Sequence, residues 1–435
     1  MSPELIGWLA IAALFLMLAF GIPVAFALTA IGLVGYAALA GLDPALGIAG
    51  LVPYAKTAVY TFTAVPLFIV MGNFAFYAGF GTDVYNTARH WVKRLPGGLA
   101  QATVVGAAGF GAACGSGLAG CAMMTKVAVP EMIRLGYDRK LAIGVAAAAG
   151  PIAQMIPPSI MMVLYGIITE QSVAKLLIAG IIPGIVCALV YMAVVYFRVK
   201  ANPRLAPAPE PFVWRQALAS LKGAWAVALL AILVMGGIYS GVFTPTEAAG
   251  VGAFGALSLA LITRRMPSGG LSAAFLDTAK TTSMLYLILV GAYIFGYLLT
   301  ITRLPAELSG LLTSLDVPRW VILISIIIFY LIIGMFMDMV PAMFITLPLL
   351  YPTVVKLGYD PIWFGVLIVQ LGEISLLTPP FGLNLIIIKG LMEEVEMTEI
   401  IRGVSPFIFG AIVTLAIYIA FPELVLFLPN MMLTH

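Results

Sequence analysis

Charged residues, histidines and cysteines are all scarce in this sequence. Charged side chains make up 9% of the 435 residues, against about 25% in an average globular domain. Hydrophobic residues make up 62%, and the mean hydropathy is +1.10. These values exclude an ordinary soluble domain and indicate a membrane protein. With two histidines, His90 and His435, an active site built on histidine is close to excluded. The three cysteines lie in apolar segments and predict no disulfide framework.

Uncharged apolar runs recur along the whole chain, and many approach the length of about 20 residues that a spanning helix needs. The sequence begins Met-Ser-Pro-Glu, without the basic region of a cleaved signal peptide, so the first run is expected to be retained as a span. Ten spans are predicted: 5–20, 23–42, 57–82, 141–169, 176–197, 223–243, 245–263, 281–302, 361–388 and 403–422.

Two further apolar segments, 97–135 and 319–357, differ from these spans. Each has small or kinking residues near its middle and polar loops at both ends. This pattern predicts two re-entrant helical hairpins, which enter and leave the membrane on the same side. The non-helical backbone at such a tip must be surrounded by protein or by a water-filled cavity.

The positions of lysine and arginine predict the sidedness of the loops. Most of the 22 basic residues lie on one side if loop 89–94 is cytoplasmic. This topology places both termini outside, with the first hairpin entering from the cytoplasm and the second from outside. Five basic residues fall on the outer side: Lys56, Lys175, Arg303, Arg319 and Lys356.

Matching residues recur at an offset of 222 positions. The offset relates Pro23 to Pro245, Gly150 to Gly372, and the proline pair 157–158 to the pair 379–380. A proline-rich cytoplasmic linker, 201–222, separates the two halves. Because an odd number of predicted crossings separates the copies, the second copy is expected to be inverted. Inverted repeats around a site at mid-membrane are typical of secondary transporters.

The same offset pairs the hairpin tips, Gly115-Ser116 with Met337-Asp338. Each hairpin is followed by a span that a proline pair interrupts, and paired prolines unwind a helix. Freed carbonyls and half-helix ends from four interrupted elements are therefore predicted to form an ion site near mid-membrane. Scattered glycines elsewhere are better explained by close helix packing.

Asp338 and Glu373 lie deep in the predicted hydrophobic segments. An intramembrane carboxylate costs at least ~2.5 kcal/mol, so both are candidates for function, although either could instead accept hydrogen bonds from backbone donors. Polar side chains near the breaks are candidates to line the substrate path: Asn73, Gln154, Ser159, Thr378 and Asn384.

At these residues the sequence resembles the large membrane subunit of tripartite ATP-independent periplasmic (TRAP) transporters. The resemblance runs from about residue 5 to about residue 421. It implies an all-α polytopic membrane protein with an inverted-repeat, elevator-type fold, two re-entrant hairpins and two broken helices. The stretches that carry it are FTAVPLFIVMGN (62–73), FGAACGSGLAG (110–120), VPEMIRLGYD (129–138), IPPSIMMVLYGIIT (156–169), GMFMDMVPA (334–342) and LLTPPFGLNL (376–385).

The elevator fold implied by the resemblance divides the chain into a fixed scaffold and a mobile transport part. The scaffold arms would be 1–80 and 223–302, and the linker 201–222 would lead from the first half of the chain to the second. The first transport half would be 81–200, with hairpin 97–135 and broken helix 141–169. The second would be 303–435, with hairpin 319–357 and broken helix 361–388.

The resemblance also implies sodium sites at the two tips and breaks. The sequence departs from many members at Gly117-Leu118, where they carry a second serine or small residue. The departure leaves open whether the first site uses a side-chain oxygen beyond Ser116. The implied sodium residues are Gly115, Ser116, Gly117, Gly150, Pro157, Asp338, Gly372, Glu373, Thr378 and Pro379, and the expected substrate contacts are Ser116, Gln154, Ser159 and Asn384.

The function implied is sodium-coupled uptake of an organic anion of the carboxylate class, in the bacterial inner membrane and without catalytic residues. The expected partners are a periplasmic solute-binding protein, membrane lipid and a small four-helix membrane subunit, but no nucleic acid. The small subunit is expected on a separate chain, because no helices precede Leu5. A stand-alone ion-coupled anion carrier and an intramembrane enzyme are the alternatives. The enzyme is disfavoured because the sequence lacks His-Glu-x-x-His, a nucleophile with a histidine partner and a phosphate-binding loop.

Overall fold

The computed structural model describes residues 2–380 and 382–432, and its described residues form helices without any strand. The chain ends Met1 and His435, and Phe381 within the predicted broken helix 361–388, lie outside the described residues. The first half contains α1 (Pro3–Ala19), α2 (Val24–Ala40), α3 (Leu42–Thr57), η1 (Tyr60–Thr63), α4 (Ala64–Tyr77), α5 (Phe80–Val92), α6 (Gly98–Cys114), α7 (Gly117–Arg134), α8 (Arg139–Met155), α9 (Ile160–Ile168), α10 (Val173–Ala179) and α11 (Ile181–Ala201).

The second half follows a short 3-10 turn, η2 (Pro203–Leu205), and repeats the same order with some fusions. Where the first half has α3, η1 and α4, the second has one long helix, α14. Its elements are α12 (Trp214–Tyr239), α13 (Pro245–Ile262), α14 (Gly270–Ile301), α15 (Leu304–Ser314), α16 (Arg319–Phe336), α17 (Met339–Lys356), α18 (Pro361–Leu377), α19 (Leu383–Leu391), α20 (Met397–Ala420) and α21 (Pro422–Met431).

Helix boundaries follow the offset of 222 closely. α7 begins at Gly117 and α17 at Met339, while α8 covers Arg139–Met155 and α18 covers Pro361–Leu377. Local signals fix these positions. Asp138 and Asp360 each accept backbone N–H groups at the start of α8 and α18, as N-cap residues do. The repeat read from prolines and glycines is therefore a repeat of helices.

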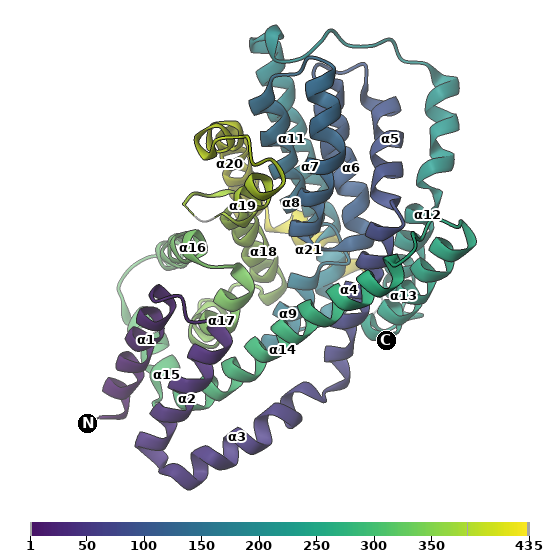
Figure 1. The fold of residues 1–435 in the computed structure, drawn as a ribbon. Coiled ribbons are helices and arrows are strands. Elements are labelled where there is room, and N and C mark those ends of the chain that lie inside the picture. Colours follow the sequence, from purple (N-terminus) through teal and green to yellow (C-terminus); the bar gives the residue numbers. More distant parts are fainter. Residues whose placement is uncertain (1, 381, 433–435) are drawn as a thin grey trace.

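The helices form two packed groups, and in Figure 1 the long helix α14 runs diagonally below α9, α17 and α18. In the first, here called the α14 body, α2 packs along α14, α13 packs along α4, and α1, α3 and α12 complete the group. In the second, the hairpin body, α6 and α7 pack on α8, α8 contacts α18 and α20, and α9, α16 and α17 pack on α18. Two short helices connect the groups: α5 packs on α6 and α12, and α15 packs on α17 and α1.

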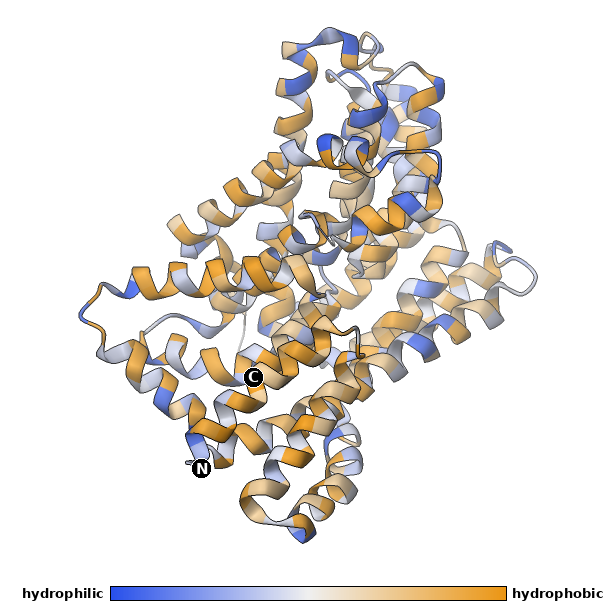
Figure 2. Cartoon of the chain, turned by 60° about the vertical axis from the view of Figure 1, so that its left-hand side comes forward, coloured by the Kyte–Doolittle hydropathy of each residue, from blue (hydrophilic) through white to orange (hydrophobic). Residues whose placement is uncertain are grey.

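Eight helices within the described residues are long and apolar enough to cross a membrane, or nine if the bent pair α8–α9 is counted as one span. The axis bends by 45° between α8 and α9. α16 and α17, predicted as the two arms of a re-entrant hairpin, each have 18 residues and pass the same length test. Figure 2 shows hydrophobic residues along most of the helices.

The helix boundaries refine the predicted segments. Within the predicted span 57–82, η1 and α4 run on without a break and form a candidate membrane span, Tyr60–Tyr77. The segment Leu42–Thr57, which lies between two predicted spans, is helical and packs on α2 and α14 despite its prolines and glycines. The linker is shorter than 201–222, since α12 already begins at Trp214.

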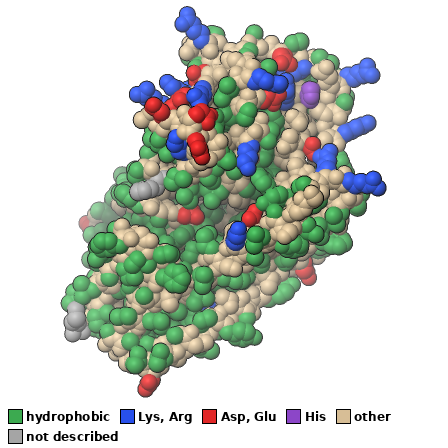
Figure 3. Space-filling model, viewed as in Figure 1, with side chains coloured by type: hydrophobic (Ala, Val, Ile, Leu, Met, Phe, Trp, Pro, Cys, Tyr) green, Lys and Arg blue, Asp and Glu red, His purple; other side chains and the backbone are tan. Residues whose placement is uncertain are grey.

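Basic side chains collect at one end of the molecule. Figure 3 shows most of the visible lysines and arginines in the upper part, around the ends of α5, α7, α11 and α20. Four ion pairs of the described residues lie among them: Arg89 with Glu131, Lys93 with Glu210, Arg139 with Glu394, and Arg265 with Asp83. This distribution matches the charge bias from which a cytoplasmic face was predicted.

Candidate functional site

The first tip, between α6 and α7, lies directly against the break between α8 and α9. Gly115 ends α6 with a φ of +60°, and a Cβ at this position would overlap the carbonyl oxygen of Pro158. Ser116 caps α7 by accepting the N–H of Ala119 at 3.4 Å. A glycine is therefore needed here both for the backbone conformation and for the close approach of two chains.

Behind this tip, α7 and α8 meet at two glycines. A Cβ on Gly150 would overlap Nδ2 of Asn384 and would lie 2.6 Å from the carbonyl oxygen of Gly117. A Cβ on Gly117 would lie 2.8 Å from Oε1 of Gln154. A backbone carbonyl and two amide side chains therefore lie close to this contact. Three of the predicted residues meet there: Gly117, Gly150 and Gln154.

Asn384 reaches this point from the second half of the chain. It is fully buried on α19, and its Nδ2 donates to the carbonyl oxygen of Ala147 on α8 at 3.0 Å. In a regular helix that carbonyl would accept the N–H of residue 151, but Pro151 has none. The amide oxygen Oδ1 of Asn384 is buried and has no hydrogen-bond partner among the described residues.

The other predicted residues of the first break are buried and mostly structural in their contacts. Ser159 is fully buried and caps α9 by accepting the N–H of Met162 at 3.4 Å. Gln154 donates from Nε2 to Sδ of Met161 at 2.9 Å, which leaves its Oε1 toward Gly117. Pro157 is buried in the turn between α8 and α9.

The second tip faces a cavity. Asp338 begins α17 and lines a space of about 320 Å³ together with Gly334, Ser375, Gly382 and Val24. No lysine or arginine of the described residues forms a salt bridge with Asp338. The carboxylate therefore faces an open volume at the boundary between the hairpin body and α2.

Contacts of the second break repeat those of the first. A Cβ on Gly372 would lie 3.1 Å from Cβ of Met339, and these two residues are the 222-offset partners of Gly150 and Gly117. Thr378 donates from Oγ1 to the carbonyl of Ile374 at 2.6 Å and so closes the end of α18. Pro379 follows in the half-exposed turn before α19.

Glu373 lies apart from the cavity at Asp338. Its side chain is fully buried, and its Oε2 accepts from Sγ of Cys187 on α11 at 3.8 Å. Its Oε1 has no hydrogen-bond partner among the described residues. Glu373 follows Gly372 on α18, but its side chain points to α11, whereas Gly372 faces α17. The side chain of Asn73 is likewise engaged elsewhere, since its Nδ2 donates to Oγ1 of Thr278 on α14 at 2.8 Å.

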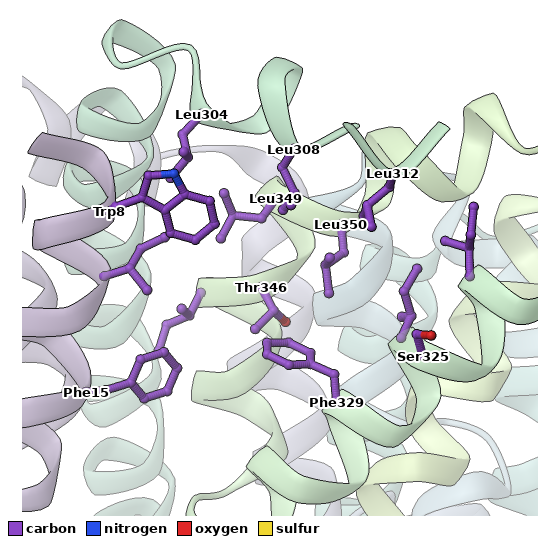
Figure 4. A pocket seen from close by; sticks show the side chains of 14 residues that line it. Trp8, Phe15, Leu304, Leu308, Leu312, Ser325, Phe329, Thr346, Leu349 and Leu350 are labelled. Carbon is purple, nitrogen blue, oxygen red and sulfur yellow. The ribbon is translucent and has the colours of Figure 1, made fainter. Parts of the chain in front are cut away.

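A different cavity, of about 290 Å³, lies between α1, α15, α16 and α17. Figure 4 shows Trp8, Phe15 and Phe329 turned into it, with Ser325 and Thr346 among the leucines. Both hydroxyls donate to carbonyls of their own helices. Since no charged side chain lines this cavity, it offers nothing to balance the charge of an anion.

Two features of the structure were not predicted from the sequence. Pro151 was a visible signal for an unpaired carbonyl at Ala147, but its donor, Asn384, comes from a helix that is distant in sequence. Lys56 was noted for its predicted outer position alone, and its surroundings are described below.

A family model described as "Tripartite ATP-independent periplasmic transporter, DctM component" matches residues 11–424. The chain belongs to this family. The DctM-type chain is therefore a large permease subunit of a TRAP transporter, a multi-pass protein of the inner membrane. The prediction of the family from the quoted motifs is confirmed.

Individual relatives agree with the family. The chain is 36% identical to the C4-dicarboxylate TRAP transporter large permease protein DctM of Pseudomonas aeruginosa, over 85% of this chain and 86% of that protein. It is 33% identical to the 2,3-diketo-L-gulonate TRAP transporter large permease protein YiaN of Escherichia coli, over 94% and 95%. It is also 33% identical to the isethionate TRAP transporter permease protein DctMQ of Oleidesulfovibrio alaskensis, over 98% of this chain and 66% of that protein. These relatives are named as permeases and not as enzymes.

Among solved structures, the YdaH transporter of Alcanivorax borkumensis is similar in fold. The TM-score is 0.59, the identity is 15%, and the match covers 89% of this chain and 90% of that chain. At this identity the likeness concerns the fold alone, and it supports a polytopic helical transporter architecture.

Proposed function

We propose that the chain is the large membrane subunit of a sodium-coupled importer, which takes up an organic anion delivered by a periplasmic binding protein. The observation that carries the proposal is the amide of Asn384 beside the close approach of Gly117 and Gly150, since its buried Oδ1 has no hydrogen-bond partner in the described part of the chain. A buried acceptor without a donor is costly, and a bound cation would satisfy it.

The first tip offers the ligands that a sodium ion takes in transporters with broken helices, namely unwound carbonyls and half-helix C-termini. The carbonyl oxygen of Gly117 and Oε1 of Gln154 lie at this contact. The amide of Asn384 reaches it as well, and its Oδ1 is buried without a hydrogen-bond partner among the described residues. The last carbonyls of α6 and α8 end nearby, and these ends carry partial negative charge. The donor set fits a small monovalent cation.

The second tip supports a second sodium site. Asp338 supplies a full negative charge in a cavity that no basic side chain of the described residues neutralises. An ionised carboxylate within the membrane is expensive without a partner. A cation held by Asp338 and by the freed carbonyls near Thr378 would offset that cost.

Energetics favour more than one coupling ion. Moving one elementary charge against 100 mV costs ~2.3 kcal/mol, so import of a dianion into a negative-inside cell needs at least two sodium ions to become favourable. C4-dicarboxylate, isethionate and 2,3-diketo-L-gulonate, for which three relatives are named, are all anions. An organic anion is accordingly the substrate class we assign.

Both tips lie where the hairpin body meets the α14 body, and this placement supports an elevator motion. A Cβ on Gly72 of α4 would lie 2.9 Å from the carbonyl oxygen of Cys114 at the first tip. Val24 of α2 lines the cavity at the second tip. A rigid shift of the hairpin body against α2 and α4 would carry both tips across the membrane together, with the small subunit supporting the α14 body.

Sodium-driven uptake is the direct test of this function. The chain is co-purified with the small subunit, reconstituted into liposomes and supplied with the cognate binding protein and a panel of radiolabelled carboxylates and sulfonates. We expect uptake under an inward sodium gradient and none under an equal potassium gradient. Uptake driven equally by a proton gradient without sodium would refute sodium coupling, and uptake without the binding protein would favour the stand-alone carrier.

A further inference from the structure

A polar cavity of about 350 Å³ lies between the two bodies, away from both tips. The C-terminal parts of α3 and α14 form one wall, and the ends of α9 and α17 form the other. Its size falls within the range of about 300–1,000 Å³ that small-molecule pockets occupy. The polar side chains that line it are Lys56, Thr169, Tyr293, Tyr297, Thr300 and Tyr351.

Lys56 is the cationic group of this cavity. It stands in the last turn of α3, is half-buried, and its Nζ lies 4.9 Å from the centroid of the Tyr293 ring. No carboxylate of the described residues forms a salt bridge with it. Glu170 is close enough to Tyr293 to interact with it electrostatically, but it lies beyond ion-pair distance of Lys56. The ammonium group therefore keeps its three donors for an anion.

The opposite wall offers a hydroxyl donor. Tyr351 on α17 accepts from Nε2 of Gln171 at 2.9 Å, so its own O–H proton is left to donate into the cavity. Thr169 and Thr300 differ, because their hydroxyls donate to the carbonyls of Tyr165 and Gly296. An anion in this space would meet a positive charge from the α14 body and a phenol from the hairpin body.

The cavity opens at the end of the molecule that the charge pattern places outside. Lys56 at the end of α3, Arg303 after α14 and Lys356 at the end of α17 all belong to the minority of basic residues predicted on the outer side. Figure 3 shows most of the visible basic side chains at the opposite end. A solute released outside the membrane would thus reach this cavity before it could reach either tip.

We propose that this cavity is a receiving site for the organic anion, in which Lys56 attracts a carboxylate or sulfonate group before the anion moves to the tips. The inference rests on the proposed function, since it assumes an anionic cargo arriving from outside. Because one wall belongs to each body, movement of the hairpin body would separate Lys56 from Tyr351 and release the anion.

Charged thiol reagents test this inference without knowledge of the substrate. A cysteine is introduced at Thr300 inside the cavity (T300C), in a chain whose buried Cys114, Cys121 and Cys187 are replaced by alanine. Intact cells are treated with the anionic sulfonatoethyl methanethiosulfonate or the cationic trimethylammonium-ethyl analogue, neither of which crosses the inner membrane. If the cysteine-free chain does not fold, the native background serves, because its three thiols are buried.

We expect Lys56→Gln to slow modification by the anionic reagent roughly tenfold, as one focused charge does, and to speed modification by the cationic one. Lys56→Arg should keep the original rates, and Glu170→Gln should raise the anionic rate. Two controls are matched: Lys175→Gln removes another outer lysine, and a cysteine at the exposed Thr313 (T313C) reports a position outside the cavity. Both should leave the rates unchanged.

Equal anionic rates with Lys56 and with the Lys56→Gln variant would overturn the inference, and so would modification of T300C from the cytoplasmic side alone. Sodium-driven uptake is measured separately, so the two failures are distinguishable. If uptake depends on sodium but the reagents show no effect of charge, the receiving site fails and the proposed function stands. If the effect of charge is seen with sodium-independent uptake, the receiving site is supported and sodium coupling fails.

Discussion

Asn384 on α19 donates a hydrogen bond to the carbonyl of Ala147 on α8, 3.0 Å away and across 237 residues of sequence. The carbonyl is free because Pro151, four residues further along α8, has no N–H. The amide of Asn384 thus replaces a missing helix donor and joins the broken helix of one half to that of the other. It also brings the amide of Asn384 beside Gly150, behind the first tip.

Asn384→Ala should destabilise the protein by about 1–3 kcal/mol, the cost of leaving a buried polar group unpaired. Pro151→Ala restores a backbone N–H that can donate to the carbonyl of Ala147, and it is therefore the variant to combine with Asn384→Ala. We expect the double variant Asn384→Ala with Pro151→Ala to unfold at a higher temperature than Asn384→Ala alone, in detergent, by thiol-dye fluorescence. Strictly additive effects of the two changes would show that Pro151 and Asn384 do not share this carbonyl.

Gly115→Ala tests the packing of the first tip against the break. Alanine at a φ of +60° costs about 1–2 kcal/mol from backbone conformation, and its Cβ would also overlap the carbonyl of Pro158. Gly136 is the matched control, because its φ is +85° and a Cβ there meets nothing within 4 Å. We expect Gly115→Ala to abolish uptake and Gly136→Ala to lower thermal stability while preserving it. Equal uptake by both variants would contradict the claim that transport requires the first tip to pack closely against Pro158.

Glu373→Gln tests whether Glu373 contributes to sodium binding, as Asp338 is proposed to do. The side chain of Glu373 contacts Cys187 on α11 and does not line the cavity at Asp338. Glutamine keeps its size and hydrogen-bonding oxygen and removes the ionisable group. We expect the sodium concentration for half-maximal uptake to stay within about twofold of the wild-type value, a difference of ~0.4 kcal/mol. A tenfold increase would make Glu373 a sodium ligand, as the family resemblance implies.

The tips, the breaks and the repeat could be read from the sequence because their signals are local. Gly115, the proline pairs and the N-cap residues Asp138 and Asp360 each determine the backbone within a few residues. The spacing of 222 then related one half to the other. Helix α3 could not be read in this way, because its prolines and glycines are outweighed by packing on α2 and α14.

The contacts within the candidate site could not be predicted from the sequence to the same extent. The sequence marked Asn384 and Gln154 as polar residues near breaks, but their meeting at Gly117 and Gly150 depends on how two distant halves pack. The direction of Glu373 was also hidden, because one position along α18 separates a face toward α17 from a face toward α11. Lys56 carried no motif at all, and its role follows from the cavity around it.

Sodium binding by the purified complex tests the central claim most directly. Titration calorimetry with NaCl in a potassium background requires neither substrate nor binding protein. We predict two sodium ions for each chain, loss of one in Asp338→Asn, and weakening of the other in Asn384→Ala, with Gly136→Ala as the unaffected control. No sodium binding to the wild-type complex, or an unchanged stoichiometry in Asp338→Asn, would contradict the two-site account.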